Sequence, residues 1–318
     1  MPLGIVCHWL ATKTLPRGGT VTYNAMEERH LQLGRWRAGK YTDRQVVDVY
    51  INNARNLTTM APTIAKAVKL FRVSASLLPL ADQVDRSLWD TPEVKREFAK
   101  AGRAFLDAGV RVTVHPGQFC VLSSPRPDVI ANAFKELDTH AWIFDAMGLP
   151  LSPHAAINLH GGKSAAHERL IQSIADLPDN VRKRLTLEND ESAYDVPDLL
   201  EVHQRTGVPV VFDSHHFTFK TGELTLEEAY AACCATWPEG VRPLQHISNT
   251  TPGLEKGNFM DRRKHSDYIQ TVPEVQLTGI WDGAIDLEVE AKMKNLAVAR
   301  LQADLRKWFG VNDPTRTW

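Results

Sequence analysis

Short apolar runs recur along this chain, and most of them are followed at once by a side chain that can bind a metal ion. Each run has the length and composition of a buried β-strand. The predicted strands are 3–7, 70–74, 111–115, 156–160, 185–188, 210–213, 244–246 and 285–288. Intervals of roughly 25 to 45 residues between the ligand-bearing ends leave room for a helix after each strand. The pattern therefore predicts a repeated strand–helix unit and a parallel sheet.

Helical patterns and helix-end signals fall between these strands. Thr91 precedes Pro92, as an N-cap precedes a first helical residue, and Gly109 and Gly148 end apolar periodic segments. The predicted helices are 43–69 with an interruption near Pro62, 92–109, 127–147, 164–177, 196–206, 225–237, 265–269 and 290–308. Residues 8–40 show no clear periodicity. This alternation predicts one domain, residues 1–318, folded as a (β/α)₈ TIM barrel. A doubly wound open sheet shares the alternation, but its site forms only where the strand order reverses.

The overall composition is that of an ordinary globular protein and excludes few functional classes. The chain has 318 residues, 24% of them charged, and a formal net charge of −1, so a nucleic-acid partner requires a local excess of positive charge. There is no apolar run of membrane-spanning length and no recognisable signal peptide, so we expect a cytoplasmic protein with no membrane partner. Cys7, Cys120, Cys233 and Cys234 form no CxxC pair and are interpreted as reduced core thiols.

Six strands end in a metal-type ligand, and a closed barrel would gather these ends at the carboxyl-terminal side of the strands. The six residues are His115, His160, Glu188, Asp213, His246 and Glu288. His216 and His265 are further candidates; His216 is favoured over His215 because it lies three residues beyond Asp213. Any one of these residues could instead be a structural histidine or a helix cap. Their coincidence on six strands favours a shared metal site.

Imidazole and carboxylate ligands together suit Mn²⁺, Zn²⁺, Fe²⁺ or Co²⁺. Because there are more ligands than one ion needs, we expect two or three ions. Clustered divalent ions favour hydrolysis of a phosphodiester. The candidate catalytic residues are Glu188, His216, Glu288 and Lys163.

Two loops after predicted strands carry candidate DNA contacts. Pro116-Gly117 forms a turn that would present Gln118 and Phe119 as a wedge for an unstacked base step, although Phe119 could equally fold into the core. Lys163 follows two glycines that would allow close approach of a phosphate, or that simply form a turn. Basic clusters at 35–40, 182–184 and 262–264 are candidate phosphate contacts or solvated surfaces.

Several of these stretches resemble the UV damage endonuclease family. They are 72–80, 115–119, 158–162, 187–191, 212–216 and 287–292. The resemblance covers roughly residues 70 to 295, in order. It implies a TIM barrel related to endonuclease IV and xylose isomerase. It also implies Mn²⁺-dependent incision immediately 5′ of cyclobutane dimers, 6-4 photoproducts and abasic sites, leaving a 3′-hydroxyl and a 5′-phosphate.

The resemblance assigns roles to individual residues. The family's metal ligands fall on His115, His160, Glu188, Asp213, His216, His246, His265 and Glu288. In the family, two residues enter the gap opposite the flipped lesion. They fall on Gln118 and Phe119, where the family usually has Gln-Tyr. Ile5 stands where the family has a tyrosine near the lesion, and Leu244 where it has a lysine that helps complete the metal site. The first difference bears on lesion recognition and the second on metal occupancy.

The expected partner is damaged double-stranded DNA. No protein partner is indicated, and a monomer is expected. Two other functions are compatible with the sequence. One is a sugar isomerase or epimerase of the xylose isomerase type, which would not need the wedge at Gln118 and Phe119. The other is a damage-binding protein without catalysis, which would not need several metal ions.

Overall fold

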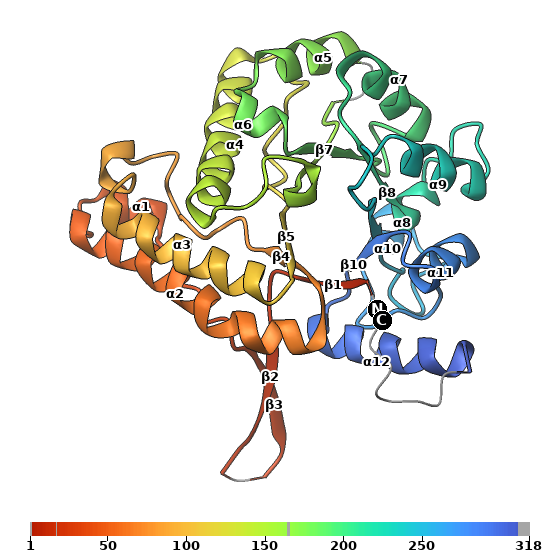
Figure 1. Ribbon diagram of the computed structural model, residues 1–318, viewed down its shortest axis with the longest axis horizontal. Helices are drawn as coiled ribbons and strands as arrows, with labels where there is room; N and C mark the ends of the chain where they lie inside the picture. The colour runs from red at the N-terminus through yellow and green to blue at the C-terminus, as the bar shows by residue number, and fades with distance from the viewer. Residues whose placement is uncertain (1, 17, 164–165, 311–318) are drawn as a thin grey trace.

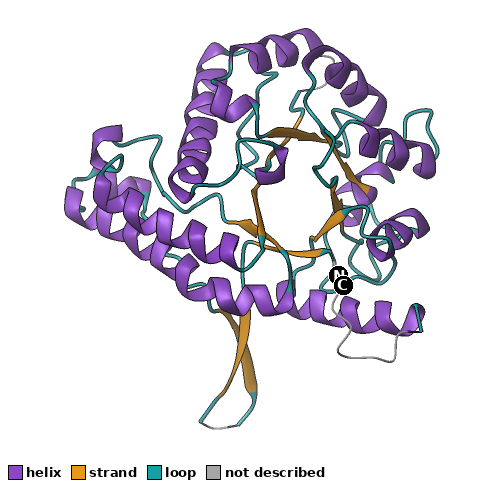
Figure 2. Ribbon diagram, in the orientation of Figure 1, coloured by secondary structure: helices purple, strands orange, loops and turns teal. Residues whose placement is uncertain are grey.

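The centre of the molecule is a closed barrel of parallel strands in the order β1-β10-β9-β8-β7-β6-β5-β4, surrounded by helices (Figure 1, Figure 2). The computed structural model describes residues 2–16, 18–163 and 166–310. The barrel strands are β1 (Leu3–Val6), β4 (Leu70–Val73), β5 (Arg111–Val114), β6 (Ile157–His160), β7 (Leu185–Glu188), β8 (Val210–Asp213), β9 (Leu244–Ile247) and β10 (Asp286–Val289). The predicted (β/α)₈ TIM barrel is confirmed, with each strand within two residues of its expected bounds.

The helices begin and end largely at the predicted signals. They are α1 (Leu33–Arg37), α2 (Asp43–Ala67), α3 (Pro92–Asp107), α4 (Pro127–Met147), α5 (His167–Asp176), α6 (Asp179–Arg182), α7 (Val196–Thr206), α8 (Ser214–Phe217), α9 (Leu226–Ala235), α10 (Phe259–Arg262), α11 (Glu274–Trp281) and α12 (Lys294–Trp308), with 3₁₀ turns at Arg86–Leu88 and Pro153–Ala155. Thr91 caps α3 by accepting a hydrogen bond from the Val94 N–H, and Gly148 ends α4 with a φ of 71°. The start of the predicted helix at Ser164 lies outside the described residues.

The barrel strands alternate between a polar interior and an apolar outer face. Thr186 and Asn158 face each other inside the barrel, where the threonine hydroxyl donates to the asparagine Oδ1 over 2.9 Å. Leu159 and Leu187, their neighbours along the strands, join the apolar layer beneath the helices. This alternation explains why ligand side chains can line the interior while the same strands hold the core together.

A hairpin, β2 (Leu10–Thr14) with β3 (Thr20–Asn24), projects from the barrel in a segment for which no element was predicted. Its side chains are almost all exposed or half-buried. Because neither face packs on a core, the strands carry no alternation of apolar and polar residues. The sequence pattern therefore gave no signal for them.

Two helix predictions were wrong. The expected interruption near Pro62 is absent, because α2 continues through Pro62 with buried Ala61 and Ile64 packed into the core on either side. Residues 265–269 form no helix. Instead, His265 pairs with Thr250 in an antiparallel bridge, and the Ser266 N–H donates to the Asn249 carbonyl over 2.8 Å.

Among the described residues, no helix has both the length and the apolar composition needed to cross a membrane.

Candidate metal centre at the barrel mouth

Three groups of histidine and carboxylate side chains lie at the carboxyl-terminal ends of the barrel strands. The groups are His115 with His160 and Glu188, Glu188 with Asp213 and His216, and His246 with Glu288 and Glu290. Within each group, one potential ligand atom from every residue lies within 4.8 Å of the others. Seven of the eight predicted ligands are thus brought together with one residue that was not predicted, and such clusters could bind metal ions.

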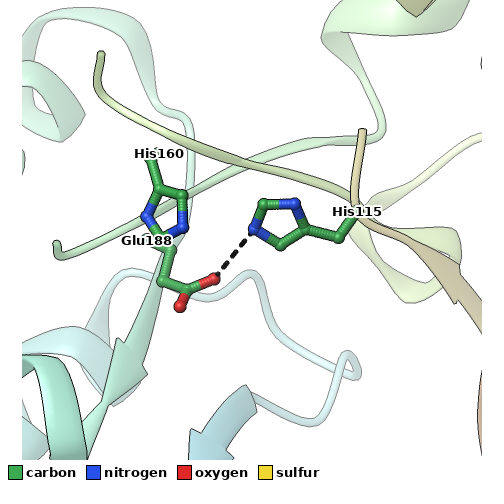
Figure 3. A group of neighbouring side chains, drawn as sticks. All are labelled: His115, His160 and Glu188. Atoms are coloured by element: carbon green, nitrogen blue, oxygen red, sulfur yellow. Dashed lines mark ion pairs between the residues drawn. The ribbon is translucent and has the colours of Figure 1, made fainter. Parts of the chain in front are cut away.

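Glu188 occupies the centre of this arrangement and belongs to two of the groups. Its Oε2 lies 3.4 Å from Nε2 of His115, and Figure 3 shows that imidazole pointing at the carboxylate. Its Oε1 lies 3.2 Å from Nδ1 of His216. Nδ1 of His246 is 3.0 Å from Oε2. A carboxylate with both oxygens directed at different imidazoles is suited to bridge two cations.

The third group is built around a buried arginine. Nη1 of Arg72 lies 3.2 Å from Oε2 of Glu288, and its Nη2 lies 2.6 Å from Oε1 of Glu290. Nε2 of His246 approaches the same Glu288 oxygen at 3.0 Å. Arg72 is 7% exposed and comes from β4, so it reaches these carboxylates from inside the barrel. The guanidinium provides a fixed positive charge beneath this part of the site.

Polar residues lower in the barrel orient the carboxylates. The Thr113 hydroxyl donates to Glu288 Oε1, and Asn158 Nδ2 donates to Glu188 Oε2. The backbone carbonyl of Asn189 lies 3.0 Å from Nδ1 of His216. Partners of this kind hold a ligand in one rotamer and fix the orientation of its donor atoms.

Burial and neighbouring charges act in opposite directions on the pKa values of the site. Burial alone would raise the pKa of Glu188, but His246 and His160 hold it well below its ordinary value. Burial alone would lower the pKa of His246, but Glu188 and Glu288 raise it well above its ordinary value. The histidine protons therefore offset carboxylate charge, and bound divalent ions would displace them.

The donor set fits divalent cations. Four carboxylates and four histidines form the three groups, with Arg72 as a buried counter-charge, so an excess of negative charge remains. In the described part of the chain, the buried atoms His160 Nδ1 and Asp213 Oδ2 have no hydrogen-bond partner. Buried polar atoms are normally paired, so both atoms are free to serve as ligands. Mixed nitrogen and oxygen donors of this kind suit transition-metal ions.

Asp213, His215 and His265 differ in how they are placed relative to the three groups. Asp213 also caps α8, because its Oδ1 accepts hydrogen bonds from the N–H groups of His215 and His216. His215 is not part of the three groups and stacks edge-on against Phe219 at a centroid distance of 5.1 Å. His265 belongs to none of the three groups, but its Nδ1 lies 3.7 Å from Oε2 of Glu290 at the rim.

Two cavities meet beside the groups. One of about 840 Å³ is lined by residues from all three groups, among them His115, Glu188 and Glu290, and a second of about 910 Å³ lies next to it. Both are lined by Gln118, Val121 and Lys163, which therefore form the ridge between them. Phe119 lines the second cavity and is 79% exposed, so it does not fold into the core.

The loops that form this ridge are fixed by hydrogen bonds from below. Glu136 Oε1 accepts from the Gly117 N–H over 2.7 Å, next to the exposed Gln118. The Lys163 N–H donates to the Ser123 hydroxyl over 2.6 Å. Gly162 has a φ of 97°, and a Cβ there would lie 2.7 Å from that hydroxyl. The exposed side chains of the ridge thus stand on anchored backbone.

Sequence reasoning missed Glu290 and Arg72. Glu290 had a usable signal, because it lies two residues after Glu288 just past a strand and therefore faces the same side. Arg72 had none, since its partners are set by closure of the barrel.

The two departures from the family pattern are both buried. Ile5 is fully buried in the apolar core, level with Phe71 on the neighbouring strand. Leu244 packs with Val211 and Trp237 in a small apolar cluster. Of the basic clusters, 182–184 precedes β7 and so lies at the opposite end of the barrel from the metal groups, where Arg184 is buried against Asp145.

Comparisons with known proteins agree on one family. The sequence model of the family described as UV-endonuclease UvdE matches residues 15–317. The UV DNA damage endonuclease of Nostoc sp. is 36% identical over 248 residues, which cover 76% of this chain and 72% of that protein. That of Deinococcus radiodurans is 35% identical over 312 residues, covering 93% of this chain and 99% of that protein. The crystal structure of SacUVDE has the same fold, with a TM-score of 0.78, 24% identity, and coverage of 97% of this chain and 99% of that one. The resemblance expected from the sequence is confirmed, and the chain belongs to the UV-endonuclease UvdE family.

Proposed function

We propose that this protein hydrolyses the phosphodiester immediately 5′ of UV photoproducts in double-stranded DNA, leaving a 3′-hydroxyl and a 5′-phosphate. Cyclobutane dimers, 6-4 photoproducts and abasic sites are the proposed lesions. The observation that carries this proposal is the position of three metal-type groups at the mouth of the barrel, beside a cavity that adjoins a second cavity lined by the exposed ring of Phe119, in a chain of this family. We further propose that residues 1–318 form one domain that acts as a monomer.

Two or three Mn²⁺ ions are the proposed cofactors. Bound ions of this type polarise a phosphate and stabilise the attacking and leaving oxygens of the displacement. The proposed ligands are His115, His160, Glu188, Asp213, His216, His246, His265 and Glu288, and the structure adds Glu290 as a candidate. Among them, Glu188 has the central role because its two oxygens face different groups.

The ridge between the cavities is proposed to hold the lesion. Gln118 and Phe119 would occupy the gap left by displaced bases, since both are exposed and stand on a loop anchored by Glu136. Lys163 would contact a phosphate, because it is exposed and lines both cavities. These residues would bind and orient the strand. The carboxylates and histidines of the three groups would bind the metal ions that neutralise the charge of the scissile phosphate.

The test is the chemistry of the cut ends. A duplex with one thymine dimer, labelled separately at each end of the damaged strand, should give a single cut directly 5′ of the dimer in the presence of Mn²⁺. The upstream fragment should be extended by a polymerase, and the downstream fragment should be a substrate for phosphatase. A cut 3′ of the dimer, a 3′-phosphate, or equal cutting of undamaged duplex would contradict the proposal.

A further inference from the structure

Apart from Phe119, which lines the neighbouring cavity, a second partly exposed apolar surface borders the metal cavity itself. It consists of Phe219, Phe259, Met260, Arg262 and Arg263, and we call it the α10 patch. Phe259 is 38% exposed and Met260 is 62% exposed, and neither belongs to the apolar core. Met260 and Arg263 line the cavity that contains the metal-type groups. The patch therefore faces the same space that we propose the scissile strand enters.

The topology places this patch across the mouth from Phe119. Phe119 follows β5, and α10 follows β9. Between β5 and β9 the barrel has β6, β7 and β8 on one side and β4, β1 and β10 on the other. Because loops after parallel strands emerge at the same end of a barrel, the two surfaces follow strands on opposite sides of the same barrel mouth. The metal-type groups lie between them.

Four side chains of the patch pack against one another although they contribute little to the core. Arg262 lies over the ring of Phe219, 5.1 Å from its centroid, and Arg263 lies over the ring of Phe259 at 5.4 Å. The two rings meet edge-on with centroids 5.6 Å apart. Side chains that are already stacked lose little conformational freedom when they bind a partner.

Hydrogen bonds fix the backbone beneath the patch. Asn258 caps α10 by accepting from the Asp261 N–H over 3.0 Å, and the Thr250 hydroxyl donates to the Arg262 carbonyl over 2.7 Å. Arg263 Nε donates to Glu191 Oε1 over 2.5 Å, which ties α10 to the loop after β7.

The charge and shape of the patch match nucleic acid. Residues 258–264 carry three cations, of which Lys264 pairs with Asp261 and Arg263 pairs with Glu191. Among the described residues, this leaves Arg262, which lies over the Phe219 ring, without a carboxylate partner. Guanidinium groups bind phosphates, whereas aromatic faces and apolar side chains pack against unstacked bases. A contiguous surface that offers both beside a metal cavity is suited to a single strand whose bases have been displaced.

We infer that the α10 patch is a second DNA-contact surface, which packs against nucleotides of the damaged strand on the side of the metal cavity opposite Phe119. This inference rests on the proposed function, because it takes the damaged strand as the occupant of the cavity. Phe119 and the α10 patch then hold the strand from two sides and keep its scissile phosphate over the metal-type groups.

The test measures DNA affinity and incision separately. Affinity is measured by fluorescence anisotropy with Mn²⁺-loaded protein and a dimer-containing duplex that carries a methylphosphonate at the scissile position and therefore resists hydrolysis. Phe259→Ala combined with Met260→Ala should raise the Kd about tenfold, since about 1.4 kcal/mol corresponds to that factor. Bound manganese should be unchanged.

Matched controls come from the other end of the barrel. Leu106 is 43% exposed and Leu151 is 48% exposed, and each shortly precedes a barrel strand, β5 and β6 respectively. Leu106→Ala combined with Leu151→Ala should leave the Kd within twofold of the wild type. Met260→Leu should likewise preserve affinity, whereas Met260→Glu should weaken it at least as much as the double alanine variant.

The outcomes separate the inference from the proposed function. If the wild type does not incise a normal dimer-containing duplex, the proposed function fails, and the Kd values still decide the inference. An unchanged Kd for Met260→Glu would overturn the inference, because this exposed side chain can be replaced without disturbing the core. An unchanged Kd together with a smaller sedimenting species for the double alanine variant would overturn it in favour of an interface between copies of the chain.

Discussion

Arg72→Met should lower the free energy of unfolding of the metal-free protein without changing its native fold. Arg72 is buried, and its two nitrogens contact the carboxylates of buried Glu288 and partly buried Glu290 at 3.2 and 2.6 Å. Methionine fills similar space but leaves both carboxylates without their guanidinium. Removing one partner of a buried ion pair costs about 3–5 kcal/mol, because an uncompensated charge stays inside the protein.

The expected change is large enough to measure by thermal unfolding in EDTA. At about 2.1 cal/mol/K of unfolding entropy per residue, a 318-residue chain should lose roughly 4 to 8 °C in Tm. Burial alone would raise the pKa of Glu290, but Arg72 holds it below the ordinary glutamate value. A depressed carboxylate pKa stabilises the protein above its unfolded-state pKa and loses that effect as the pH falls. The difference between the variant and the wild type should therefore narrow in acid.

A surface pair provides the control. Arg126 and Asp128 form an exposed ion pair, and Arg126→Met should leave Tm unchanged within error. Added Mn²⁺ should raise the Tm of Arg72→Met more than that of the wild type, because the ions then supply positive charge to Glu288 and Glu290. A Tm for Arg72→Met in EDTA equal to that of the wild type would refute the idea that Arg72 is the counter-charge of Glu288 and Glu290 in the metal-free protein.

Three further predictions concern the proposed reaction. Glu188→Ala should abolish incision and lower the bound metal measured by elemental analysis while the circular dichroism spectrum is retained; full activity without metal would contradict this role. Phe119→Ala should reduce incision of a dimer-containing duplex by roughly ten- to a hundredfold, because stacking contributes about 1–3 kcal/mol. The loss should be smaller at an abasic site, and the metal content should be unchanged. Equal losses on both substrates would indicate that Phe119 has only a packing role. Lys163→Glu should weaken binding of damaged and undamaged duplex alike and reduce the slope of log affinity against log salt by about one or more; a salt-independent Kd would argue against a phosphate contact.

The strands and most of the ligand set could be predicted because both depend on local patterns. A ligand directly after an apolar run, as at His160 or Glu188, marks the end of a barrel strand, and parallel strands deliver such ends to one mouth. Glu290 was within reach of the same reasoning, through the two-residue alternation from Glu288.

The remaining features depend on tertiary structure. Arg72 meets its carboxylates only because barrel closure brings β4 near β10, and no pattern within a strand records that approach. The β2–β3 hairpin has no buried face, and α10 is too short to show helical periodicity. Pro62 is a sound local signal for a helix end, but burial of Ala61 and Ile64 outweighs it.

The most direct test of the metal centre is incision measured against metal bound. Protein stripped of metal is titrated with Mn²⁺, and the incision rate of a dimer-containing duplex is followed together with the equivalents bound per chain by elemental analysis. The groups that share Glu188 and the separate group at His246 predict that activity requires more than one equivalent and disappears in EDTA. Full incision at one equivalent or less, or incision that persists in EDTA, would contradict the account.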